Sequence, residues 1–89
     1  MLIVKILSLG APERYALRRM LAAAQQEFQS HDLQLQITVI EVNDAGQIGQ
    51  YASVLVMPTL VINEKVVCSG RFPTRDEIIG WLGEAANNQ

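Results

Sequence analysis

The sequence of 89 residues has little of several residue types that mark particular classes of protein. It contains one cysteine, Cys68, so neither an intramolecular disulfide nor a metal site of paired cysteines can form. Seven basic and nine acidic residues give a net charge of −2, whereas nucleic-acid-binding domains are usually basic. No apolar run approaches the roughly 20 residues of a membrane span. We therefore expect no metal or other cofactor, and no nucleic-acid or membrane partner.

The length and the single thiol also suggest an organisation and a compartment. A chain of 89 residues has room for one core, so residues 1–89 are expected to form one domain. The opening "MLIVKILSLGAPERY" contains an apolar run, but Lys5 interrupts it, and a first strand explains it better than a signal peptide. A lone cysteine fits a reducing compartment, so we expect a cytoplasmic protein. The end of the chain, residues 84–89, is expected to be a frayed tail.

The first half of the chain predicts a strand, a helix and a second strand. Residues 2–7 are mainly apolar and β-branched, as in a buried strand. Pro12 suits the first turn of a helix that ends near residues 30–32. The inner face of this helix is predicted from apolar residues at three- and four-residue steps: Leu17, Met20, Leu21, Ala24 and Phe28. Alternation from 33 to 39 then predicts a half-buried strand at or near a sheet edge.

The second half predicts a short helix, a hairpin and a closing helix. Asn43 or Asp44 can cap the short helix. Residues 59–62 and 65–69 read as two strands joined at Asn63-Glu64, where a tight turn would need positive φ at both positions. Thr74 and Glu77 match a capping box, and the closing helix buries Ile78, Ile79 and Leu82. The expected fold is α/β, in the order β-α-β-α-β-β-α, with a mixed four-stranded sheet flanked by helices.

Two segments resemble small thioredoxin- and glutaredoxin-like domains of the prokaryotic "redox-active disulfide" type. "LSLGAPERYAL" lies where those domains have a strand, a glycine and Cys-Pro-x-Cys opening a helix. "VLVMPTLVINEKVVCSGRFPTRDEIIGWL" resembles their cis-proline segment, hairpin and closing helix. The resemblance covers nearly the whole chain and implies a thioredoxin-like fold.

The chain departs from this pattern at the reactive motif. Ala11 and Arg14 stand in the places of the two cysteines, in the sequence Ala11-Pro12-Glu13-Arg14. Dithiol chemistry needs a thiolate at the helix start and a second thiol that resolves the mixed disulfide. Neither residue can supply one. We therefore expect no dithiol–disulfide oxidoreductase activity, and no enzyme activity is assigned.

The resemblance nevertheless implies a binding surface. In thioredoxin-like proteins the residue before the cis-proline offers a backbone edge with which extended peptides pair, and this needs no cysteine. Here Met57 precedes Pro58, so a cis bond is expected between them. The expected function is a redox-inactive module that binds an unidentified protein or peptide. Its predicted binding residues are Ala11, Pro12, Arg14, Met57 and Pro58.

Other functions remain open from the sequence. Cys68 could act as a single reactive thiol, although a free cysteine on a strand is usually buried and inert. Arg14 and Arg18, with the N–H groups of the helix start, could contact glutathione or another small anion. A third alternative is an interaction protein like the clock protein KaiB, which also lacks the dithiol. The segments "GAPERYALRRML" and "VMPTL" resemble parts of that protein.

Overall fold

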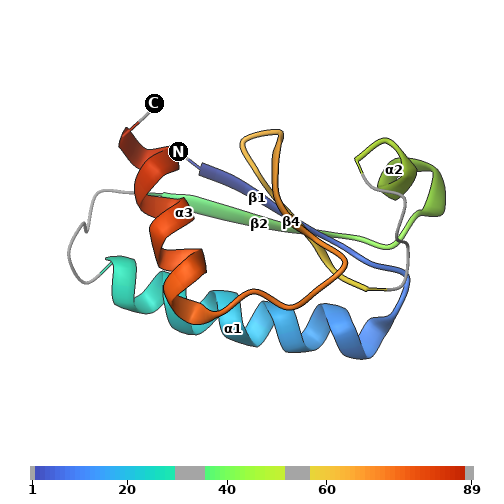
Figure 1. Cartoon of the computed structure of the whole chain (residues 1–89), viewed down its shortest axis with the longest axis horizontal. Coiled ribbons are helices and arrows are strands. Elements are labelled where there is room, and N and C mark those ends of the chain that lie inside the picture. Colours follow the sequence, from blue (N-terminus) through green and yellow to red (C-terminus); the bar gives the residue numbers. More distant parts are fainter. Residues whose placement is uncertain (1, 30–35, 52–56, 88–89) are drawn as a thin grey trace.

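A computed structural model describes residues 2–29, 36–51 and 57–87 and confirms the expected fold class (Figure 1). Four strands form one sheet in the order β2-β1-β3-β4. Strand β1 pairs with β2 in parallel and with β3 antiparallel, and β3 pairs with β4 antiparallel. In chain order the elements are β1 (Leu2–Leu7), α1 (Ala11–Gln29), β2 (Ile37–Val42), α2 (Ala45–Gly49), β3 (Thr59–Ile62), β4 (Lys65–Ser69) and α3 (Arg75–Asn87).

Helices α1 and α3 lie on the same side of the sheet and bury the main core (Figure 1). Alternate residues of β1 point toward these helices, because successive side chains of a strand face opposite sides. The predicted inner face of α1 is confirmed, with Met20 and Phe28 packed at its margin. The fully buried members of this core are Leu2, Val4, Ile6, Leu17, Ala24, Leu60, Ile78 and Leu82.

Among the described elements, α2 covers one end of the other face of the sheet (Figure 1). Ile48 of α2 packs with Leu7 and Val61 in a second, smaller core. Asp44 caps this helix as expected, since its Oδ1 atom accepts hydrogen bonds from the backbone nitrogens of Gly46 (2.8 Å) and Gln47 (3.3 Å). Elsewhere on this face Ile3, Ile40 and Val66 remain 37–41% exposed.

The structure corrects the predicted position of the second strand. The strand expected over 33–39 runs over Ile37–Val42, because its span is fixed by parallel pairing with β1, from Leu2↔Ile37 to Leu7↔Val42. Residues 33–35, and the expected end of α1 at 30–32, lie outside the described residues. The predicted edge position of this strand is confirmed.

The expected frayed tail is wrong for residues 84–87, which continue α3 to Asn87. Glu84 and the two alanines after it favour helix, and Ala85 packs against the main core. Packing therefore extends the helix by a further turn. Residues 88–89 lie outside the described part of the chain.

The hairpin between β3 and β4 has a turn that is costly for one of its residues. Asn63 and Glu64 both have positive φ, 51° and 68°, as a type I′ turn requires. Asn63 suits this conformation, and its Oδ1 atom accepts a hydrogen bond from Ile3 N at 2.9 Å. Glu64 does not, but its carboxylate accepts hydrogen bonds from Lys5 Nζ and from the Tyr51 hydroxyl, both at 2.6 Å. These bonds offset the strain of about 1 kcal/mol.

Strand β4 contains a bulge opposite β3. Leu60 pairs with Cys68, whereas the next residue of β3, Val61, pairs with Val66. Val67 is therefore the extra residue, and two residues of β4 face one of β3. Val67 packs against the main core, as Cys68 does, so both belong to the layer between the sheet and the helices.

Candidate functional site

The sheet brings the two predicted binding segments to the same end. Leu7, the last residue of β1, pairs with Thr59, the first residue of β3. The segment from Ser8 to Arg14 leaves the sheet at this point, and Met57 and Pro58 enter it there. Figure 1 shows the start of α1 and the start of β3 at the same end of the molecule. The register thus places both segments at one end of the sheet, as the resemblance implies.

Helix α1 begins at Ala11, in a turn held by local hydrogen bonds. Gly10 O accepts the first helical bond from Arg14 N at 3.1 Å. Gly10 N in turn donates to the hydroxyl of the buried Ser8 at 3.1 Å. Ala11 is partly exposed and Pro12 is exposed. The positive end of the helix dipole therefore lies at a surface position that carries a methyl group and no nucleophile.

Arg14 folds back over the end of the sheet. Its Nη1 atom donates to the carbonyl oxygen of Ser8 at 2.8 Å, and its Nε atom lies 3.7 Å from Glu41 Oε1. The side chain is only 13% exposed. Arg14 thus joins the loop after β1, the first turn of α1 and the end of β2. Its contacts are those of a structural clamp.

The carboxylate of Glu41 also engages the second arginine of the predicted anion site. Arg18 Nη1 donates to Glu41 Oε2 at 2.8 Å, although the Arg18 side chain is 63% exposed. A glutamate of the chain itself therefore takes the place expected for a bound anion. Sequence reasoning missed Glu41 because its orientation depends on the parallel register. It pairs with Ile6, which faces the helices, so Glu41 faces them too.

Met57 and Pro58 differ from expectation in one respect. Between described residues no peptide bond is cis, so Met57–Pro58 is trans and the predicted cis-proline is wrong. The trans form of an X–Pro bond is intrinsically favoured by about 0.5–1 kcal/mol. Pro58 is buried, and its carbonyl oxygen accepts a hydrogen bond from Gly70 N at 3.1 Å. Met57 is partly exposed and precedes the β3 ladder, which begins at Thr59.

Cys68 lies in the main core and is 6% exposed. Its thiol donates to the carbonyl oxygen of Arg71 at 3.5 Å, and burial raises the pKa of the thiol. A reactive cysteine needs the opposite conditions, namely access to solvent and a lowered pKa. The geometry therefore favours a packing role for Cys68 and supplies none of the features of a reactive thiol.

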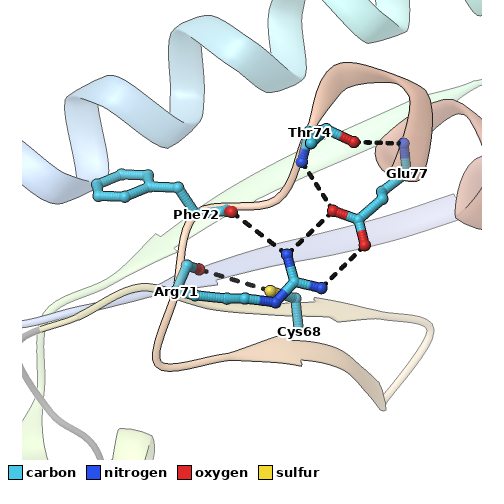
Figure 2. Close-up of polar contacts among 5 residues, drawn as sticks. All are labelled: Cys68, Arg71, Phe72, Thr74 and Glu77. Atoms are coloured by element: carbon cyan, nitrogen blue, oxygen red, sulfur yellow. Dashed lines mark hydrogen bonds and ion pairs between the residues drawn. The ribbon is translucent and has the colours of Figure 1, made fainter.

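The segment that covers Cys68 is fixed by an ion pair and a capping box (Figure 2). The Arg71 guanidinium forms two hydrogen bonds with the Glu77 carboxylate, at 3.0 and 2.9 Å. Thr74 and Glu77 exchange the predicted capping-box bonds, Thr74 N to Oε1 at 3.0 Å and Glu77 N to Oγ1 at 3.1 Å. Arg71, and then the Thr74 amide, lower the pKa of Glu77 to about 2.

A polar cluster on the opposite face of the sheet was not predicted. Lys5 Nζ donates to Glu64 and, at 3.0 Å, to the Tyr51 hydroxyl, and it lies 5.4 Å from the centre of the Tyr51 ring. The hydrogen bond with Glu64 raises the pKa of Lys5, and the bond from Lys5 lowers the pKa of Glu64. The three residues come from three distant segments. The only sequence signal was the unusual glutamate in a tight turn.

The described residues contain neither a group of three metal-ligating side chains nor a helix that is long and apolar enough to cross a bilayer. A comparison with curated proteins finds no match. A comparison with protein families finds the model described as "Thioredoxin domain", which matches residues 3–83. The match spans β1 to most of α3 and includes the helix start at Ala11 and the segment at Pro58. The chain therefore belongs to this thioredoxin family.

Proposed function

We propose that this thioredoxin-like protein carries out no dithiol–disulfide exchange and binds an extended segment of a partner protein at the end of the sheet beside Ala11. The observation that carries the proposal is the pair Ala11 and Arg14 at the helix start. The one thiol of the chain, Cys68, is buried in the core. Neither position at the helix start can form a mixed disulfide with a substrate.

The exposed side chains around this helix start support binding by apolar contact. Leu9 is 40% exposed and Tyr15 is 58% exposed, so both offer apolar surface to solvent next to the helix start. Pro12 and Tyr15 are three residues apart and so share one face of α1. Met57 adds a partly exposed apolar side chain from the facing segment. Pro58 is buried, so it contributes by shaping the backbone after Met57.

The ion pairs at this end of the sheet favour the binding of an uncharged partner segment and disfavour the binding of an anion. Glu41 is already paired with both Arg14 and Arg18. An added carboxylate or phosphate would have to compete with a carboxylate that is tethered to the same chain. A segment with apolar side chains faces no such competition, and its backbone can pair beside Met57 as an added strand.

The redox half of the proposal is tested by restoring the missing thiols. The purified protein should not reduce a protein disulfide in the presence of a dithiol reductant beyond the background rate. The double variant Ala11→Cys/Arg14→Cys should do so. Ala11→Cys alone lacks a resolving thiol and should be slower, because the reductant must then release each mixed disulfide. Reduction by the unaltered protein above background would overturn the proposal.

The binding half is tested by site-specific photo-crosslinking. A photoreactive phenylalanine analogue at position 12 should capture a partner in cells, whereas the same analogue at the exposed Ala23 of α1 should not capture it. The partner should then bind the purified protein, and Tyr15→Ala and Met57→Glu should weaken that binding while Ala23→Glu should not. Equal binding by all three variants would place the contact elsewhere.

A further inference from the structure

A cavity of about 270 Å³ lies between the β3–β4 hairpin and α3. It lies beside Ile62, the last residue of β3, and Asn63. Met57 lies at the opposite end of this strand, just before its first residue. Figure 1 shows the hairpin and α3 on this side of the molecule, away from the start of α1. The cavity is therefore separate from the surface proposed above to bind a partner segment.

The walls of this cavity combine four apolar side chains with the polar Asn63 and two opposite charges. Ile62 and Val67 line the hairpin side, and Trp81 and Ala85 line the helix side. Lys65 stands on the hairpin wall and Glu84 on the helix wall. Within the described part of the chain no ion pair joins these two, and neither pairs with another residue.

This pattern selects for a particular kind of small molecule. Small-ligand sites usually combine apolar walls with a few placed polar groups, and roughly 300–1,000 Å³ is typical. This cavity of about 270 Å³ lies just below that range and suits a small ligand. One cation and one anion on opposite walls give no net attraction for an anion such as a nucleotide. They fit a small molecule that carries an ammonium group, a carboxylate group and an apolar side chain.

We propose that the cavity binds a free α-amino acid with an apolar side chain. The side chain lies against Trp81 and Val67, the carboxylate of the ligand faces Lys65, and its ammonium group faces Glu84. This site is independent of the partner surface beside Ala11, because no residue is common to the two. The two proposals therefore stand or fall separately.

The chain offers a built-in reporter, because Trp81 is its one tryptophan and lines the cavity. Titration of the full-length protein with L-phenylalanine, under excitation selective for indole, should change the Trp81 emission in a saturable manner. The Kd should be on the order of 1 mM, as the modest affinity per atom of ordinary small ligands implies. Two analogues, 2-phenylethylamine and 3-phenylpropanoate, each lack one charge and should bind more weakly.

Variants of Lys65 and Glu84 test which charged group of the ligand each of these residues contacts. Lys65→Gln and Glu84→Gln should each weaken L-phenylalanine binding about two- to fivefold, as expected for a solvent-accessible charge pair. In Lys65→Gln the advantage of L-phenylalanine over 2-phenylethylamine should disappear, and in Glu84→Gln its advantage over 3-phenylpropanoate should disappear. Both residues are exposed, so neither substitution should impair folding. Asp76→Asn, an exposed acid of α3 outside the cavity, is the matched control.

Three results would overturn the proposal. One is the absence of a saturable change in Trp81 emission with L-phenylalanine. Another is binding of either analogue by the unaltered protein as strongly as L-phenylalanine. The last is an equal loss of affinity for L-phenylalanine in Asp76→Asn and in the two cavity variants. That result would mean that the net charge of the protein, and not a contact in the cavity, affects binding.

Discussion

The guanidinium of Arg14 lies between the carbonyl oxygen of Ser8, at 2.8 Å, and the carboxylate of Glu41, at 3.7 Å. By the resemblance described above, Arg14 takes the place of the second cysteine of the Cys-Pro-x-Cys motif. A position associated with chemistry in the family is thus taken by a residue that fastens three segments together. The helix start keeps its shape through this clamp, without a disulfide.

Arg14→Met should therefore destabilise the protein. The substitution removes a hydrogen bond from a charged donor and an ion pair that is largely shielded from solvent, at an expected cost of about 1.5–3 kcal/mol. Urea denaturation would measure this cost as a lower midpoint. Arg18→Met, which removes a 63% exposed partner of the same Glu41, should cost under about 1 kcal/mol. Equal losses in the two variants would contradict the clamp.

Cys68 should react slowly with a thiol reagent in the folded protein. Its pKa is raised by burial and it is 6% exposed, so both the thiolate fraction and access are low. Labelling at neutral pH should be at least tenfold faster in urea at full denaturation, since a few per cent of an exposed thiol is already ionised there. Labelling in native buffer at the rate seen in urea would show that the thiol is accessible.

The ion pair of Glu77 should make stability depend on pH in acid. The pKa of Glu77 is about 2 in the folded protein, because of Arg71 and the Thr74 amide, and is near 4.5 when the chain is unfolded. A depressed folded pKa adds stability above pH 4.5 and loses it as the pH falls toward 2. Urea midpoints measured across this range should fall more for the unaltered protein than for Glu77→Gln.

The control for this experiment is Asp76→Asn, next to Glu77 on the same turn of α3 but in no ion pair between described residues. The pH profile of Glu77→Gln should differ from that of the unaltered protein more than the profile of this variant does. A profile of Glu77→Gln that runs parallel to the unaltered one between pH 4.5 and 2 would assign the acid sensitivity to other carboxylates.

The hairpin turn predicts a difference between two substitutions at one position. Glu64→Gly and Glu64→Ala both remove the bonds to Lys5 and Tyr51, but only alanine keeps a Cβ atom at φ 68°. The glycine variant should therefore be more stable than the alanine variant by about 1 kcal/mol in urea denaturation. Equal stabilities would mean that the turn rearranges once the carboxylate is gone.

Features that depend on neighbouring residues could be predicted from the sequence. The Thr74–Glu77 capping box, the Asp44 cap and the two-residue hairpin loop all form within a few residues, and all three are confirmed. The buried face of α1 follows in the same way from its helical spacing. The order of the elements predicted the mixed four-stranded sheet, and the family resemblance added the thioredoxin-like fold; both are confirmed.

Features that join distant segments could not be predicted in this way. The bond from Arg18 to Glu41 crosses 23 positions, and the bond from Lys5 to Glu64 crosses 59. Each depends on the sheet register, and the predicted strand at 33–39 stopped before Glu41. The trans bond at Pro58 was missed because the resemblance, and no local signal, implied a cis one.

The bulge in β4 has a consequence for the shape of the molecule. A regular strand turns every second side chain to one layer, but β4 directs Lys65, Val67 and Cys68 toward the helices. The extra residue lets one short strand fill the interior with Cys68 and still furnish a wall of the cavity beside Trp81. Deleting Val67 would regularise the pairing of the hairpin and would remove one apolar residue from the wall of the cavity.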